Sequence, residues 1–196
     1  SGAAARAWGG TDWTLAPTDA GTAITAEKFF TFGAAPGAGY RVSFTQIDRL
    51  DYRRSGTGPA EGVLQYQIGA GAFTDVGPLS FSSSASGGES LGPILLSSIT
   101  ELQNVAGETP VTFRIVPFGA TGASGTFYIF DRANTTAADL SVKGLVNPTS
   151  GTPPAITSFS PDNGGAGTVV TIDGTLFTAA PTVSFNGIPA PGATVN

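Results

Sequence analysis

The sequence predicts an all-β protein, on the basis of three observations. Short clusters of valine, isoleucine, phenylalanine and tyrosine recur along the 196 residues, and many alternate with polar residues as in a half-buried strand. Glycine (28) and proline (14) are abundant between these clusters, which is typical of short strands joined by turns. Hydrophobic residues make up 40% of the chain and charged residues only 12%, which is enough apolar material for a packed core.

Charge limits the partners that we expect. The net charge is −5, and the only two adjacent basic residues are Arg53 and Arg54, so no clustered positive surface for nucleic acid is expected. No apolar run approaches the roughly 18 residues of a membrane-spanning helix, so membrane insertion is not expected either.

Missing residue types limit the chemistry. The chain has no cysteine and no histidine, so it cannot assemble a Ser-His-Asp or Cys-His nucleophile, or a zinc site built from imidazole or thiolate ligands. A glycoside hydrolase with two carboxylates remains conceivable, but most glutamates fall in turn-rich or helical stretches: Glu61, Glu89, Glu101 and Glu108. Glu27 begins a strand without an obvious partner. We therefore expect no enzyme activity and no cofactor other than calcium.

Residues 1–15 contain both tryptophans, Trp8 and Trp13, around a Gly9-Gly10 turn signal. This segment is interpreted as a terminal strand pair or an irregular start. The two indoles can cap the end of a sandwich core, or they can form a stacking platform for sugar rings.

The next two strands show a change of phase. An alternating strand is expected over 26–32, and a Gly/Pro turn over 34–39. Tyr40, Val42 and Phe44 then share one face, and the pattern shifts before Ile47. A bulge near 45–46 accounts for that shift.

The stretch 47–59 is a strand that runs into a Ser-Gly-Thr-Gly-Pro turn. Alternation sends Arg53 and Arg54 to opposite faces. One arginine can pair with a neighbouring aspartate while the other bonds carbonyl oxygens around Gly56 and Gly58. The alternative is a joint clamp for a carboxylate or sulfate on an acidic glycan.

The remaining elements up to residue 143 follow from the same patterns. A hairpin is expected from 64–68 and 73–76, and the only helix from the apolar spacing of 95–102. Further strands are expected over 111–116, 126–130 and 140–143. The loop before the last strand carries three candidate calcium ligands, Asp131, Asn134 and Asp139. Asp12 and Asp19, near the start of the chain, are possible further ligands. Such loop residues are otherwise turn formers or caps.

Several motifs resemble a jelly-roll module that recurs in large secreted or surface-anchored bacterial proteins. They are Phe-Phe-Thr-Phe at 29–32, Arg-Arg-Ser-Gly-Thr-Gly-Pro at 53–59, Val-Thr-Phe-Arg-Ile at 111–115 and Gly-Thr-Phe-Tyr at 125–128. The resemblance implies an extracellular jelly-roll β-sandwich over residues 1–147. The connection over 131–139 is longer than such modules usually have. The candidate ligand-binding residues are Trp8, Trp13, Arg53, Arg54 and Tyr128.

A Pro/Gly/Ser/Thr connector over 148–154 separates a second module at 155–196. Its Ser-Pro start, Gly-Thr-Val at 167–169, Gly174 with Phe177, and Val-Ser-Phe-Asn-Gly at 183–187 resemble the opening half of an IPT/TIG domain. This resemblance implies a partial immunoglobulin-like β-sandwich. The motifs of the closing strands are absent.

Half a sandwich leaves an apolar face open. Either a longer chain was cut, or a strand from another copy completes the sandwich and builds a filament, with residues 1–15 as a candidate donor. The residues expected at such a self-assembly contact are Ile156, Phe159, Val170, Ile172, Phe177, Val183 and Phe185.

The leading functional hypothesis is a non-catalytic structural or adhesive protein, located outside the cell or on the surface of a bacterium, whose partners are other copies of itself or other surface proteins. A glycan-binding appendage of a larger secreted protein is the second hypothesis, and a carboxylate glycosidase is the third. An aromatic row on a sheet face favours the second, and two facing carboxylates in a cleft favour the third.

Overall fold

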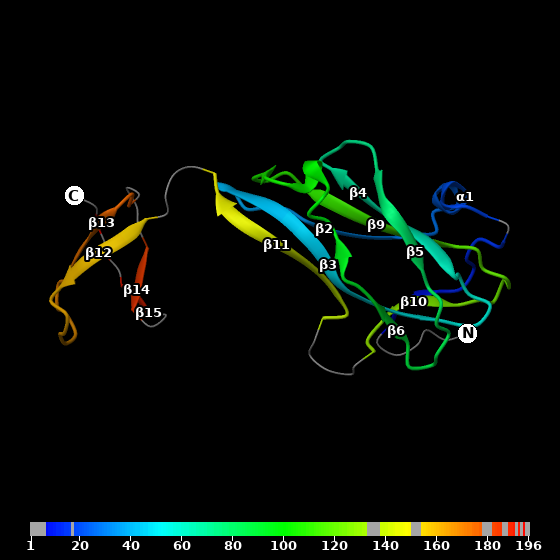
Figure 1. Cartoon of the computed structure of the whole chain (residues 1–196). Helices are drawn as coiled ribbons and strands as arrows, with labels where there is room; N and C mark the ends of the chain where they lie inside the picture. Colours follow the sequence, from blue (N-terminus) through cyan, green and yellow to red (C-terminus); the bar gives the residue numbers. More distant parts are fainter. Residues whose placement is uncertain are drawn as a thin grey trace. The chain divides into compact units, whose positions relative to one another are not determined.

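The computed structural model describes residues 7–16, 18–132, 138–149, 154–177, 182–185, 188–190, 192 and 194. The chain divides into two compact units, Ser1–Thr149 and Ser150–Asn196 (Figure 1). The last strand of the first unit, β11, runs from Leu140 to Pro148, and Thr149 N donates a 2.8 Å hydrogen bond to Gly39 O. The first two residues of the expected connector therefore pack with the first unit.

The first unit is a β-sandwich of two antiparallel sheets. In the larger sheet β1 pairs with β10, and β10 and β11 both pair with one edge of the long strand β3. The opposite edge of β3 pairs with β6, β7 and β8. The described strands of this sheet are β1 (Ala7–Gly10), β3 (Tyr40–Arg54), β6 (Glu89–Leu91), β7 (Ile94–Leu95), β8 (Val105–Ala106), β10 (Phe127–Phe130) and β11. Figure 1 shows the long strand β3 running beside β11.

The smaller sheet has the order β2–β9–β4–β5. Its strands are β2 (Phe30–Ala34), β4 (Glu61–Ile68), β5 (Thr74–Ser80) and β9 (Val111–Phe118). β4 and β5 form the hairpin expected from the sequence. The all-β prediction is confirmed by these two sheets. Whether the unit belongs to the jelly-roll module that the motifs resemble stays a prediction.

Two bulges in β3 explain the phase changes in its sequence. The register of β3 against β11 shifts twice, and each shift leaves one extra residue on β3: Thr45 and Asp48. Because each bulge inserts a residue, Phe44, Ile47 and Leu50 all point into the core although they lie three apart. The predicted bulge near residues 45–46 is confirmed.

The core between the sheets is rich in aromatic rings. Phe127 is fully buried, and its ring centroid lies 4.5 Å from that of Phe81 and 5.8–5.9 Å from those of Trp13, Phe30 and Tyr52. These residues come from segments far apart in the sequence, so the cluster fastens both sheets and the N-terminal segment together.

The helix prediction was wrong. Within residues 95–102, Leu95 ends β7 and Thr100–Leu102 form a single 3₁₀ turn, η1, in which Leu102 is buried. An α-helix instead occurs at α1 (Ala20–Thr25), where the Asp19 carboxylate accepts a 2.8 Å hydrogen bond from Thr22 N. A six-residue helix is too short to show a helical period, and the N-cap decides where it starts. The strand expected over 26–32 accordingly begins later, at Phe30.

The second unit contains two antiparallel strand pairs. β12 (Ala155–Ser160) pairs with β13 (Thr171–Thr175), and β14 (Val183–Phe185) pairs with β15 (Ile188–Ala190). In the part of the chain that the structure describes, no helix is long and apolar enough to cross a membrane.

Candidate functional site

The Arg54 side chain holds the turn that follows β3. Its Nη1 donates hydrogen bonds to Ser55 O at 3.0 Å and Gly58 O at 3.2 Å. Nη2 donates to Ser82 O at 3.3 Å, and Nε donates to Phe81 O. One guanidinium therefore ties the β3–β4 turn to the segment that follows β5, as the structural interpretation of this arginine expected.

The same turn interlocks with the loop between β9 and β10. Ser55 N donates to Thr126 O at 3.1 Å, and Thr126 N donates to Ser55 Oγ at 3.0 Å. A side chain at Gly58 would collide with the carbonyl of Thr126, whereas Gly56 has open space around it. Close packing against the β9–β10 loop therefore explains the glycine at position 58.

Arg53 and Tyr128, two of the candidate ligand-binding residues, face each other across β3 and β10. The Arg53 guanidinium carbon lies 5.3 Å from the ring centroid of Phe130, so this arginine stacks on a ring, and it has no ion pair with an aspartate among the described residues. Tyr128 is only 5% exposed. Arg53 and Arg54 have separate contacts and do not form a joint clamp.

The two tryptophans lie in different environments. Trp13 belongs to the core, and its Nε1 donates a 2.9 Å hydrogen bond to Gly10 O. Trp8 lies on β1, is 56% exposed, and meets Phe30 edge to face at 4.9 Å. The indoles therefore do not share an exposed platform, because Trp13 is buried.

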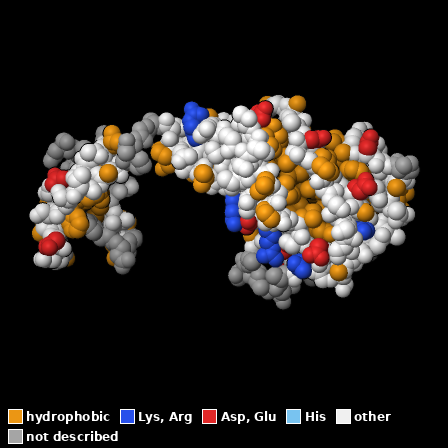
Figure 2. All heavy atoms as spheres, in the orientation of Figure 1, with side chains coloured by type: hydrophobic (Ala, Val, Ile, Leu, Met, Phe, Trp, Pro, Cys, Tyr) orange, Lys and Arg blue, Asp and Glu red, His pale blue; other side chains and the backbone are white. Residues whose placement is uncertain are grey.

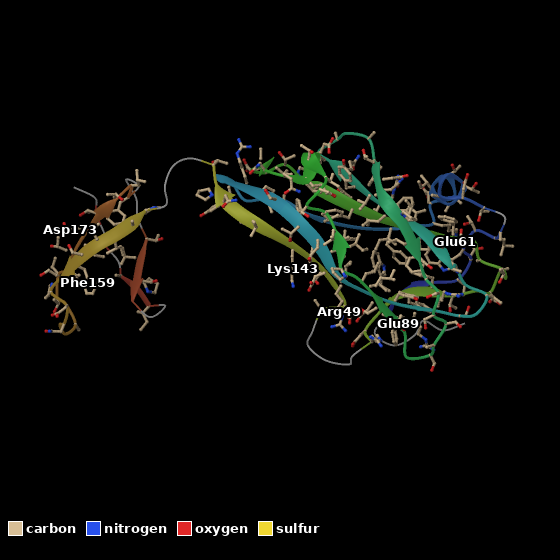
Figure 3. All side chains as sticks on the ribbon, viewed as in Figure 1. Arg49, Glu61, Glu89, Lys143, Phe159 and Asp173 are labelled. Carbon is tan, nitrogen blue, oxygen red and sulfur yellow. The ribbon has the colours of Figure 1, made fainter. Side chains whose placement is uncertain are left out.

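Two ion pairs lie on the face of the larger sheet that points away from the core. Asp51 is fully buried there, 2.7 Å from Arg49 Nη2, and it accepts a 2.5 Å hydrogen bond from Ser90 Oγ. Lys143 Nζ lies 2.8 Å from Asp48. Figure 3 shows Arg49 and Lys143 on the same side of the sheet, and Figure 2 shows basic and acidic side chains mixed along it. The hydrogen bond from Arg49 to Asp51 raises the pKa of this guanidinium.

The candidate calcium residues are only partly described. Asp139 Oδ1 is buried without a hydrogen-bond partner among the described residues, and Asn134 lies outside them. Burial raises the pKa of Asp139, and the negative charges of Asp131 and Asp51 raise it further. Within the described ranges no group of three or more acidic side chains is placed to hold a metal ion.

Asp12 and Asp19, the two further candidate calcium ligands, have other partners. Asp12 forms a 2.9 Å ion pair with Lys28, and Asp19 caps α1. The expectation that these two aspartates join the loop residues is not supported, because local contacts hold each carboxylate.

We expect Asp139→Asn to raise the stability of the first unit at neutral pH. A raised carboxyl pKa in the folded state means that ionised Asp139 opposes folding at neutral pH. The gain from the amide should therefore shrink as pH falls through the folded pKa and vanish below the unfolded pKa. Urea denaturation at several pH values measures it.

If calcium binds at this loop, Asp139→Asn should lower the stability of the calcium-bound protein. If the Asp139 carboxylate is a ligand, calcium should raise the melting temperature of the wild type, chelator should remove the increase, and Asp139→Asn should abolish it. A melting temperature that neither calcium nor chelator changes would remove the calcium hypothesis.

In the second unit, one face of the β12–β13 pair is apolar and exposed. Phe159 is opposite Ile172, and Ile156 is opposite Gly174, with a register shift between Ile156 and Ser158 that puts Ile156 and Phe159 on the same face. The Phe177 ring occupies the space where a Gly174 side chain would lie. We call this set, Ile156, Phe159, Ile172 and Phe177, the Phe159 face.

The Phe159 face is open to solvent. Ile156 is 62% exposed and Phe159 is 56% exposed. The opposite face is polar, because Ser158 Oγ donates a 2.9 Å hydrogen bond to Asp173. Figure 3 labels Phe159 and Asp173 on this strand pair.

The other residues expected at a self-assembly contact are less informative. Val170 and Val183 are half-buried, and the side chain of Phe185 lies outside the described residues. Among the described residues of this unit, further exposed apolar side chains were not predicted from the sequence: Val169, Leu176 and Ile188.

Residues 7–15 of the candidate donor segment are not available to complete a sandwich in another copy of the chain. Ala7–Gly10 pair with β10 of the same chain, Trp13 lies in the core, and Leu15 bridges to Ala120. These contacts commit the segment to its own sandwich, which contradicts the donor expectation for residues 7–15. Residues 1–6 lie outside the description.

Glu61 and Glu89, two of the candidate glutamates, belong to different sheets. Glu61 starts β4 in the smaller sheet, while Glu89 lies in β6 of the larger one, 3.8 Å from Arg132 (Figure 3). A groove of about 300 Å³ between β2, β3 and β11 has an apolar lining with Lys143 as its charged residue.

The smaller sheet carries a polar surface that was not predicted from the sequence. Arg114 of β9 lies between the rings of Phe29 and Phe73, with its guanidinium carbon 5.2 and 3.7 Å from their centroids. Alternation within 111–116 does place Arg114 on the outer face. The rings that stack on it come from outside that strand, so no local pattern in the sequence indicates them.

Comparison with known proteins identifies part of the chain. Residues 154–196 match the family description "IPT/TIG domain". No curated protein and no solved structure matches the chain.

Proposed function

We propose that this chain is a non-catalytic structural or adhesive protein of the bacterial cell exterior, and that it makes a protein contact through the Phe159 face. The IPT/TIG domain is an immunoglobulin-like, non-catalytic domain that is often found in extracellular or surface proteins. This match supports the location and the absence of a reaction in the second unit.

The observation that carries the proposal is the exposure of Ile156 and Phe159 on one side of a strand pair whose other side is polar. In immunoglobulin-like sandwiches, such an apolar face packs against strands of a second sheet. Contiguous exposed apolar side chains mark contact surfaces in soluble proteins. The partner that we propose is another copy of this chain, which presents the same face.

Sedimentation velocity of the full chain over a range of concentrations tests this contact. We expect the wild type to self-associate and Phe159→Asp to weaken association by about tenfold or more, because a buried unpaired charge costs several kcal/mol. Ser158→Ala, on the polar face of the same strand, is the control and should associate as the wild type does. A wild-type chain that stays monomeric at all concentrations contradicts the proposal.

A further inference from the structure

The outer face of the smaller sheet has two unlike halves. Over one half, Ala23 of α1 packs on Val63 and Val116 and closes the face with apolar contacts. The other half is centred on Arg114 of β9, on which the rings of Phe29 and Phe73 lie. Its directly opposed neighbours are Thr31 on β2 and Gln65 on β4.

The Arg114 guanidinium is held rigidly on this half of the face. Phe29 and Phe73 stack on it, and its Nε donates a 2.8 Å hydrogen bond to Gln65 Oε1. Gln65 in turn donates a 2.7 Å hydrogen bond from Nε2 to Asp75 Oδ1. Residues of three adjacent strands thus form a chain of fixed polar groups, Arg114–Gln65–Asp75.

Other polar atoms of this chain are left for a further partner. Among the described residues, Nη1 and Nη2 of Arg114 and Oδ2 of Asp75 take part in no hydrogen bond. Asp75 and Thr31 are exposed, so solvent reaches this surface. Four N–H donors and a carboxylate acceptor are therefore presented side by side, next to the Phe73 ring.

This combination fits a sugar better than an anion. Each hydroxyl of a vicinal diol donates one hydrogen bond and accepts others, so it can bridge a guanidinium and a carboxylate. The Arg114 guanidinium covers one face of the Phe73 ring, and the second face of the ring can pack against the C–H face of a pyranose. The Asp75 charge opposes a second anion, and burial lowers the pKa of Arg114 without neutralising it.

We propose that the surface formed by Thr31, Gln65, Phe73, Asp75 and Arg114, the Arg114 surface, binds the hydroxyl groups of a neutral saccharide. Arg114 donates to the sugar oxygens, Asp75 accepts from the sugar hydroxyls, and Gln65 fixes the spacing between the two. The site lies in the first unit, so it is independent of the contact proposed for the Phe159 face.

Affinity gel electrophoresis of the full chain tests the site. The probes are the neutral polysaccharides arabinoxylan, galactomannan, mixed-linkage β-glucan and dextran, with polygalacturonate as the anionic comparison. We expect at least one neutral polysaccharide to retard the wild type. Arg114→Met keeps an apolar stem between the rings and removes the donors, and should weaken retardation by about tenfold or more.

Two further variants sharpen the test. Thr31→Glu changes an exposed residue on an edge strand and puts a carboxylate beside Arg114, so it should block binding even if Arg114→Met does not fold. Arg53→Met removes an equal charge from another ring-stacked arginine and should bind as the wild type does. Phe159→Asp should also retain retardation, which separates this proposal from self-association.

Three results would overturn the proposal. They are no retardation by any neutral polysaccharide, equal retardation of the wild type and Thr31→Glu, and retardation by polygalacturonate alone. The last would indicate an anion site.

Discussion

Replacement of Phe127 by alanine should lower the free energy of unfolding of the first unit by about 3–5 kcal/mol, the usual cost of emptying a large aromatic site in a core. Phe127 is fully buried, and its ring meets those of Trp13, Phe30, Tyr52 and Phe81. The alanine variant would leave a cavity between the two sheets and would lose these ring contacts.

Tryptophan fluorescence during urea denaturation measures this loss. Both tryptophans, Trp8 and Trp13, belong to the first unit, so the signal reports that unit alone. Phe130→Ala is the matched control, because Phe130 lies on the same strand, is only half-buried and stacks with Arg53. It should cost about 1 kcal/mol. Equal losses for the two variants would contradict the central position of Phe127.

Arg54→Met should cost about 2–4 kcal/mol in the same unit, because hydrogen bonds from a charged group contribute about 1.5–3 kcal/mol each and only partly add. The variant leaves Phe81 O, Ser82 O and Gly58 O without their donor. The same fluorescence measurement applies.

Arg53→Met supplies the control for Arg54. It removes the same charge one residue earlier, where the guanidinium only stacks on Phe130, and should cost about 1 kcal/mol or less. If the two variants lose similar stability, net charge explains the effect and the hydrogen bonds of Arg54 do not.

The sequence by itself determined many of the strands of the first unit. Alternation and Gly/Pro turns predicted the β4–β5 hairpin and the strands β9 and β10, because these patterns depend only on neighbouring residues. The phase shifts around Thr45 also predicted a bulge, since an inserted residue changes which side chains face inward. The motifs of residues 155–196 indicated the immunoglobulin-like domain that the family comparison supports.

The short helix α1 could not be predicted in this way. Its six residues carry no helical period, and it is stabilised by the Asp19 cap and by packing of Ala23 on a sheet that forms elsewhere in the sequence. Apolar spacing over 95–102 predicted a helix, but Leu95 pairs with β3 as part of β7 and stays exposed, whereas Leu96 and Leu102 are buried in the core.

The candidate sites were decided by the tertiary structure. Whether Trp13 or Trp8 is exposed, and which arginine stacks on a ring, depends on residues that are distant in sequence and adjacent in space. The Arg114 surface is the clearest case, since Phe29, Gln65, Phe73 and Asp75 reach it from three other segments. Local patterns specify the direction in which a side chain points, and only the folding of separate strands into one sheet specifies what it meets there.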